Sequence, residues 1–274
     1  MSTNYENGLF QLSWYLDAVS PGWNALISDN YNQTFPLTEI KKGGAVQMFQ
    51  PIFTREFEFN GSFNELFEYL KTNYKFIQFR SSKKNQNTSS ILREHQLLHL
   101  NENTKANYST NAKRLIKKSN QLVEYKTLFD LNPFIDIVNK TLVDKIAEFT
   151  PENIEKLKRL MTNAIQNKMG ECIGVFQNDK LVGAGFFFHY KNRITYLKGA
   201  AFDEAKKNGA MFGLINFAIE KYSKDYTVFD FGGSDIKNVA QFYKKFGALS
   251  QQYYNYEINQ LPFYYKWAKK WLKK

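Results

Sequence analysis

The sequence contains little cysteine, proline or histidine, with one, six and three residues of these types among 274. Cys172 has no second cysteine with which to form an internal disulfide. The scarcity of proline, together with the lack of a long polar tract, argues against a disordered chain. No stretch approaches the roughly 18 consecutive apolar residues of a membrane helix, and the longest block, residues 181–188, has the length of a strand. Residues 1–8 show no basic start before an apolar block, so we expect no signal peptide. These absences favour a cytoplasmic protein without a membrane span.

Motifs for metal binding and for several common reaction types are also missing. His95 and His99 lie four residues apart in an apparent strand, and no acidic or cysteine cluster accompanies them to complete a metal site. There is no P-loop, no nucleophile elbow and no zinc motif. Cys172 has no basic neighbour in sequence and is more typical of a buried thiol. We therefore expect no metal cofactor.

The sequence is rich in aromatic residues and in positive charge. Aromatic residues make up 17% of the chain and apolar residues 43%, enough to fill the cores of a folded protein. The 37 Lys and Arg against 26 Asp and Glu give a net charge of +11. Such an excess favours polyanionic partners, namely nucleic acid, phosphorylated cofactors or an anionic membrane face, although a well-solvated basic surface explains it equally well. The basic residues gather in two segments, Lys105, Lys113, Arg114, Lys117, Lys118 and Lys126, and Lys266, Lys269, Lys270, Lys273 and Lys274.

Hydrophobic periodicity predicts an α+β fold in two parts. The first part has helices at 7–19 and from Ser62, and strands at 23–27, 35–40, 45–50, 76–79 and 95–100. The second has helices at 102–118, 131–149, 151–166, 209–222 and 235–246, and strands at 172–176, 181–190, 194–201, 227–231 and 251–258. We expect domains at 1–103 and 104–274, the second ending in a helix whose Trp267 and Trp271 either dock on the first domain or lie on an anionic membrane.

Two segments carry a resemblance to a known family. Residues 242–248, Phe-Tyr-Lys-Lys-Phe-Gly-Ala, followed by a strand rich in tyrosine, resemble the last motif of the GNAT acyltransferase superfamily. Residues 229–234, Phe-Asp-Phe-Gly-Gly-Ser, together with the basic stretch 104–118, resemble the FemAB-type branch. The resemblance implies tandem GNAT-like domains, the first degenerate, each with a mixed, mostly antiparallel sheet flanked by helices. Many members of that branch transfer amino acids from aminoacyl-tRNA to cell-wall precursors.

Strands 194–201 and 227–231 are expected to splay apart. Backbone N–H groups on the open edge would then contact a thioester or ester carbonyl. The helix that begins at Gly209 offers N–H groups and a positive dipole end to a phosphate. In the family's loop Lys206 takes the place of Gln or Arg and Met211 that of a small residue, so a plain helix start with solvated lysines is the alternative. The residues assigned to the cofactor are Lys198, Lys206, Lys207, Gly209 and Ala210.

Tyr243 is the first candidate for catalysis. The resemblance implies that it protonates the departing thiolate as a general acid, and the alternative is an aromatic residue of the core. Lys244 or Lys245 corresponds to a lysine that assists transfer in the FemAB-type branch, or else both are solvated lysines at a helix C-terminus. Asp230 either orients an amine, serves as a base or holds a turn, and Ser234 or Asp235 is expected to cap a helix.

The expected function is transfer of an acyl group from an acyl-CoA donor such as acetyl-CoA to a small-molecule or peptide amine, with the acceptor in the cleft between the domains. Aminoacyl-tRNA is the alternative donor, favoured by the basic stretch 104–118, and a cell-wall precursor would then be the acceptor. A third possibility is a binding module that has kept the fold and lost the chemistry.

Overall fold

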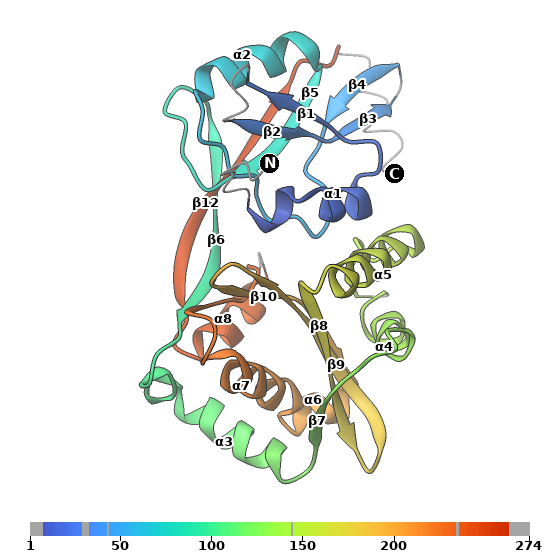
Figure 1. Cartoon of the computed structure of the whole chain (residues 1–274), viewed down its shortest axis with the longest axis vertical. Helices are drawn as coiled ribbons and strands as arrows, with labels where there is room; N and C mark the ends of the chain where they lie inside the picture. Colours follow the sequence, from blue (N-terminus) through green and yellow to red (C-terminus); the bar gives the residue numbers. More distant parts are fainter. Residues whose placement is uncertain (1–7, 29–32, 43, 144, 234–235, 263–274) are drawn as a thin grey trace. The chain divides into compact units, whose positions relative to one another are not determined.

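The computed structural model describes residues 8–28, 33–42, 44–143, 145–233 and 236–262 (Figure 1). The chain forms two compact units, Met1–Arg93 with Gln252–Lys274 (unit 1) and Glu94–Gln251 (unit 2). These limits differ from the expected domains 1–103 and 104–274, because the first unit ends ten residues earlier and also contains most of the last strand, from Gln252 onwards. Trp267 and Trp271, which the sequence placed in a C-terminal helix, lie outside the described residues.

Unit 1 contains two small sheets and an aromatic core. The strands β1 and β2 pair antiparallel, and a second sheet has the order β3-β4-β5-β12, in which only β4 and β5 run parallel. Helix α2 begins where the sequence predicts, because the Ser62 side chain accepts a hydrogen bond from the Glu65 N–H. The elements are η1 Leu9–Gln11, α1 Ser13–Val19, β1 Asn24–Ile27, β2 Thr34–Leu37, β3 Glu39–Lys42, β4 Ala45–Met48, α2 Phe63–Asn73, β5 Phe76–Ser81 and β12 Leu249–Asn259.

Unit 2 is a mixed sheet with helices on both faces. Its strand order is β6-β11-β10-β9-β8-β7, and only β10 and β11 run parallel. Helices α3, α7 and α8 cover one face and α4 and α5 the other (Figure 1). The elements are β6 Ser90–His99, η2 Thr104–Asn107, α3 Thr110–Asn120, β7 Glu124–Thr127, α4 Asn132–Leu142, α5 Pro151–Gln166, β8 Gly170–Gln177, β9 Lys180–Tyr190, β10 Arg193–Ala201, α6 Asp203–Lys207, α7 Ala210–Tyr222, β11 Val228–Asp230 and α8 Lys237–Lys244.

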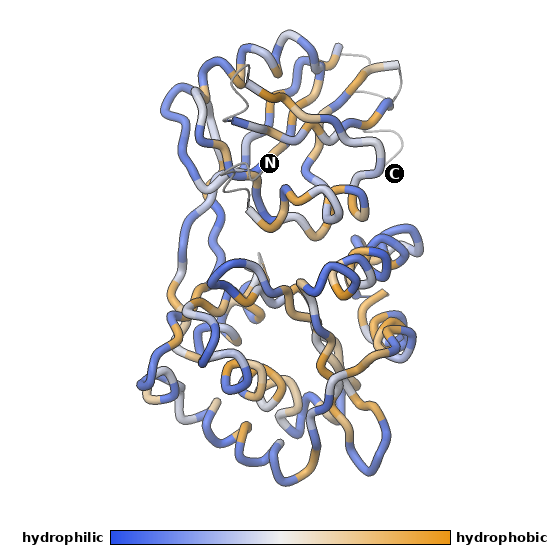
Figure 2. Tube along the Cα trace, viewed as in Figure 1, coloured by the Kyte–Doolittle hydropathy of each residue, from blue (hydrophilic) through white to orange (hydrophobic). Residues whose placement is uncertain are grey.

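Burial follows from this layering. Strand β9 is buried on both faces from Gly183 to Phe188, as its continuous apolar run predicts. Figure 2 shows apolar residues along the strands of this sheet, whereas helix α3 is largely hydrophilic. None of the helices in the described ranges has the length and hydrophobicity needed to cross a bilayer.

Several element limits differ from the sequence prediction for local reasons. The basic helix expected at 102–118 is broken into η2 and α3, because Ser109 adopts an extended conformation and caps α3 by accepting from the Ala112 N–H. The helix expected at 131–149 ends at Leu142. The short elements β7 and α6 were not predicted.

Two strands lie in sheets that chain order does not indicate. Strand β6 pairs antiparallel with β11 of unit 2, with His99 opposite Val228. Strand β12 pairs antiparallel with β5 of unit 1, with Tyr254 opposite Ser81. Each unit therefore completes its sheet with a strand from the other half of the chain.

Candidate functional site

The parallel strands β10 and β11 separate partway along their length. Pairing covers three positions, from Arg193 opposite Val228 to Thr195 opposite Asp230. Strand β11 ends there, whereas β10 continues to Ala201 and has no further pairing on that side among the described residues. The open edge predicted from the sequence is present.

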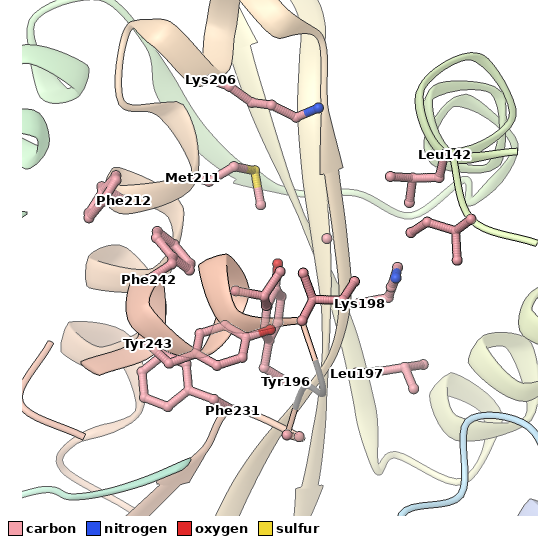
Figure 3. Close-up of a pocket in the computed structure, with 16 residues that line it drawn as sticks. Leu142, Tyr196, Leu197, Lys198, Lys206, Met211, Phe212, Phe231, Phe242 and Tyr243 are labelled. Carbon is pink, nitrogen blue, oxygen red and sulfur yellow. The ribbon is translucent and has the colours of Figure 1, made fainter. Parts of the chain in front are cut away.

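A bulge in β10 lies at the same place. The pairing of β10 with β9 shifts register between Tyr196 and Lys198, so Leu197 has no partner in the β9 ladder. In Figure 3, Leu197 and Lys198 project to the side of β10 on which Leu142 of α4 lies, whereas Tyr196 projects towards α7 and α8. Bulges re-aim side chains in this way, and this one places consecutive residues of one strand on the same face.

The turn after β11 is fixed by a buried carboxylate. Asp230 is fully buried, and its Oδ1 accepts a hydrogen bond from the Gly232 N–H at 2.9 Å. Its Oδ2 lies 2.9 Å from Arg193 Nη1, and His95 Nδ1 lies 3.5 Å from Oδ1. Gly232 has a φ of +79°, and a Cβ there would lie 2.7 Å from the Tyr196 carbonyl oxygen, so the turn requires glycine. Asp230 thus holds the chain at the point where the two strands separate.

A pocket of about 420 Å³ opens from this gap (Figure 3). Its walls come from α4 and the segment after it, β10, α6, α7, the turn after β11, and α8. The lining is mostly apolar with a few polar groups, which is typical of small-molecule sites. The lining residues are Leu142, Ile146, Tyr196, Leu197, Lys198, Gly199, Lys206, Met211, Phe212, Phe231, Gly232, Gly233, Ile236, Val239, Phe242 and Tyr243.

Two tyrosines supply hydroxyl groups to the pocket. The Tyr243 ring packs 4.7 Å from that of Phe231 and 6.3 Å, edge to face, from that of Tyr196 (centroid distances). In Figure 3 the Tyr243 hydroxyl points from α8 towards β10. Within the described part of the chain, neither hydroxyl has a hydrogen-bond partner. Burial raises the pKa of both phenols, with a smaller contribution from the Asp230 carboxylate at Tyr243. Both therefore carry a proton at neutral pH.

Lys198 supplies a cation to the same pocket. Its Nζ lies 4.4 Å from the centroid of the Phe149 ring, a cation–π arrangement. Burial lowers the pKa of Lys198 to about 8, and the Glu148 carboxylate opposes this shift. Across the described ranges no carboxylate lies within ion-pair distance of Lys198. The ammonium form of Lys198 therefore has no ion-pair partner among the described residues to offset the cost of its burial.

Replacing Lys198 by Met should stabilise the folded protein near pH 7. The folded chain binds this proton more weakly than the unfolded chain, whose lysines titrate near 10.4. The penalty on the wild type is therefore full below pH 8 and disappears as the pH rises through about 10.4. The shift corresponds to about 3 kcal/mol, which water in the open pocket reduces, so we expect a gain of ~1–2 kcal/mol.

Urea unfolding of the wild type and of Lys198→Met at pH 7 and near pH 10 measures this gain. The gain should shrink at the higher pH. Lys140→Met, a change of the same chemistry at an exposed position of α4, is the control and should leave stability unchanged. Equal stability of wild type and Lys198→Met at pH 7 would show that Lys198 is not destabilised by burial.

The residues expected to bind a pyrophosphate are not gathered in one place. Lys206 lines the pocket, but its Nζ lies 3.1 Å from Asp203 Oδ1, and Lys207 is exposed. The backbone N–H groups of Lys206, Asn208 and Gly209 already donate to backbone carbonyls of the α6 segment.

The start of α7 is covered by α3. Gly209 and Ala210 are buried, and a Cβ at Gly209 would lie 2.5 Å from the Leu115 carbonyl oxygen. Neither of these two residues lines the pocket. The close approach of α3 therefore limits the space for a phosphate at Gly209.

The other predicted catalytic residues surround the pocket rather than line it. Lys244 is exposed, and Lys245 Nζ lies 5.7 Å from the centroid of the Phe212 ring. Asp230 lies beneath the turn. Ser234 and Asp235 lie outside the described residues. Within the described ranges, no three His, Cys, Asp or Glu side chains gather as a metal site.

Sequence reasoning missed the role of Tyr196 as a lining residue. The strand pattern marked it as one apolar position among many, and only the bulge brings its ring against Tyr243. The sequence did indicate a turn at Gly232-Gly233, and this turn forms the floor of the pocket.

Comparisons with known proteins bear on the fold. No family model and no curated protein matches the sequence. Among solved structures, FemX aligns with a TM-score of 0.67 and 12% identity over 94% of both chains. L-PGS from Bacillus licheniformis aligns with a TM-score of 0.57 and 12% identity over 85% of this chain and 83% of the other. A tandem GNAT protein from the clavulanic acid biosynthesis pathway aligns with a TM-score of 0.54 and 8% identity over 91% of this chain and 87% of the other. The chain therefore has the α+β fold of FemX and the tandem GNAT proteins, with mixed, mostly antiparallel sheets flanked by helices.

Proposed function

We propose that the pocket of unit 2 is the site of an acyl transfer to an amine. The observation that carries the proposal is the separation of β10 and β11 beyond Thr195 and Asp230, next to a bulge and open to a pocket that Tyr243 lines. A carbonyl group in this gap would meet strand backbone that has no partner strand on that side. Backbone N–H groups in such a position stabilise the negative charge that develops on a carbonyl oxygen.

The residues present fit the steps of such a transfer. The nitrogen of a neutral amine attacks the acyl carbon and forms the new C–N bond. The bond from that carbon to the sulfur or oxygen of the donor then breaks, and its electron pair stays on the departing atom. Tyr243 donates its phenolic proton to that atom, which requires the protonated phenol that its burial maintains. The attacking nitrogen gives up one proton as the amide forms, and this proton passes through water to restore Tyr243.

The donor is an activated acyl thioester or ester, and specific observations favour a nucleic-acid ester over coenzyme A. The N–H groups of Lys206, Asn208 and Gly209 are engaged in backbone hydrogen bonds, and α3 approaches Gly209 closely, with the Leu115 carbonyl oxygen 2.5 Å from the position of a Cβ there. Helix α3, which packs closely against α7, presents a basic face instead. Its exposed basic side chains are Lys113, Arg114, Lys117 and Lys118. We therefore propose aminoacyl-tRNA as the donor, with acyl-CoA as the alternative.

If aminoacyl-tRNA is the donor, tRNA binding should weaken steeply as the salt concentration rises, and substituting basic residues of α3 should reduce this dependence. Each lysine–phosphate contact adds about one unit to the slope of log K against log salt. Lys113→Gln with Lys117→Gln should therefore weaken tRNA binding and reduce this slope by about two units. Lys140→Gln with Lys180→Gln removes the same charge from exposed positions elsewhere in unit 2 and should leave the slope unchanged.

Transfer assays with labelled acetyl-CoA and labelled aminoacyl-tRNA, each with a panel of amines and amino-terminated peptides, separate the donors. Transfer from aminoacyl-tRNA that the α3 double variant weakens supports the proposal. Transfer from acetyl-CoA, unaffected by that variant, would assign coenzyme A. Transfer from neither would overturn the acyl-transfer proposal and leave a binding module on this fold.

A further inference from the structure

The described residues of the pocket wall offer few groups that can accept a proton. The titratable residues among them are Tyr196, Lys198, Lys206 and Tyr243, and the described wall contains no Asp, Glu, His or Cys. An alkyl amine reaches neutral solution mostly as its ammonium ion, which has no electron pair to attack a carbonyl. A transferase that uses such an acceptor needs a group that removes one proton.

Three of the four titratable residues do not suit that task. Burial raises the pKa of Tyr196 and Tyr243, so both phenols keep their protons and serve as donors. Lys206 is held by Asp203, with Nζ 3.1 Å from Oδ1. This contact engages the Lys206 Nζ with a carboxylate that does not line the pocket.

Lys198 differs from the other three residues in its surroundings and in the direction in which its side chain points. The bulge at Tyr196–Lys198 turns it to the side of β10 on which Leu142 of α4 lies, away from the side on which Tyr196 and the Tyr243 ring lie (Figure 3). Its Nζ rests over the Phe149 ring instead of a carboxylate. The charged group that bears on it is the Glu148 carboxylate, which favours the ammonium, and the other lysine of the same wall, Lys206, is paired with Asp203. Burial outweighs Glu148, so neutral and charged Lys198 coexist near pH 8.

We propose that Lys198 is the base that deprotonates the acceptor, which enters the pocket from the side of α4. This inference rests on the proposed acyl transfer and gives Lys198 a role on the acceptor, whereas the sequence placed it with the cofactor. The neutral ε-amine of Lys198 takes a proton from the acceptor ammonium, and the freed nitrogen attacks the acyl carbon from one side of the gap. Tyr243 protonates the departing atom from the other side. As the amide forms, the attacking nitrogen sheds its second proton, which passes through water to restore Tyr243, and Lys198 returns the first proton to bulk water.

Chemical labelling tests the state of Lys198 independently of any substrate. A brief pulse of acetic anhydride acylates only neutral amines, and mass spectrometry of the peptides reports each lysine as a function of pH. Lys198 should reach half its maximal labelling near pH 8, about two units below an ordinary lysine. Half-maximal labelling of Lys198 only near pH 10 would overturn the inference.

Kinetics with two acceptors test the role itself. Glycinamide must lose a proton before attack, whereas hydroxylamine is uncharged at neutral pH. With the donor that supports transfer, Lys198→Met and Lys198→Arg should lower kcat for glycinamide by about 10²-fold, while kcat for hydroxylamine changes by less than about threefold. For the wild type, kcat for glycinamide should rise with pH and level off above about pH 8, because the base works in its neutral form.

The remaining kinetic results would each decide against a base at Lys198. Equal losses with both acceptors would make Lys198 structural, and full activity of Lys198→Arg would mean that its charge, not its basicity, is used; both overturn the inference. Lys140→Met is the matched control and should keep wild-type rates. If the wild type transfers to neither acceptor from either donor, the proposed function fails, and the labelling profile alone still decides whether Lys198 is neutral near pH 8.

Discussion

Replacing Tyr243 by Phe should lower kcat for acyl transfer by about 10²-fold or more while the protein remains folded. The change removes a hydroxyl that faces the pocket and has no hydrogen-bond partner among the described residues, so no buried group loses a contact. The aromatic packing on Phe231 and Tyr196 is retained. Because the lost proton acts only on the departing atom, KM should change little.

Steady-state kinetics and thermal unfolding, measured together, check this expectation. Tyr108→Phe is the matched control, since Tyr108 is a buried tyrosine of the same core that contacts Phe246 but does not line the pocket. Its rates should equal those of the wild type. The pKa of Tyr243 is raised by burial and by Asp230, so the wild-type rate should show no alkaline decline from this group in ordinary assay buffers. Unchanged turnover of Tyr243→Phe would remove it from the mechanism.

Replacing Asp230 by Ala should destabilise unit 2 by about 2–4 kcal/mol, near the range for a broken buried ion pair. Asp230 is fully buried, so its loss leaves the Gly232 N–H without its hydrogen-bond acceptor and Arg193 without its carboxylate partner. The value lies towards the lower end because the Arg193 side chain is 38% exposed and can reach water. Since the turn after β11 forms the floor of the pocket, activity should fall as well.

Denaturant unfolding and the transfer assay separate the roles of Asp230. Asp230→Asn keeps an oxygen for the Gly232 N–H, so it should recover part of the stability. Asp203→Ala, which removes an exposed carboxylate near Lys206 and Lys145, should change stability little because surface pairs contribute little. A stable but inactive Asp230→Ala would contradict the positioning role and indicate that the carboxylate takes part in the reaction.

The contrast between Tyr243 and Asp230 shows how the site is built. Both residues were candidates for catalysis from the sequence, yet one presents its polar group to the pocket and the other buries it in contacts with Arg193 and His95. A substitution of the first is expected to affect rate without stability, and a substitution of the second to affect both. Comparing the two variants therefore separates the loss of a catalytic group from the loss of the structure that positions the site.

The sequence by itself determined most of the elements and their order, although not the short β7 and α6. Ser62 and Thr150 cap the helices that follow them, and the apolar run of β9 indicates burial on both faces. These signals are local, since a cap or a hydrophobic period depends on residues a few positions apart. The resemblance of residues 242–248 and 229–234 added the fold, and three of the residues expected in the site, Tyr243, Lys198 and Lys206, line one pocket.

Only the tertiary structure decided which strands complete each sheet and which way the site residues face. The pairing of β6 with β11 and of β12 with β5 joins residues more than a hundred positions apart. The alternation of side chains along β6 or β12 would fit more than one partner strand, so it does not identify the partner. The side that Lys198 faces depends on one extra residue in the β10–β9 ladder, and a shift of one residue reverses the face of every side chain that follows. The surroundings of Asp230 likewise include His95, 135 positions earlier in the chain. Such long-range contacts leave no periodic trace in the sequence, because they are selected by packing and burial once the elements meet.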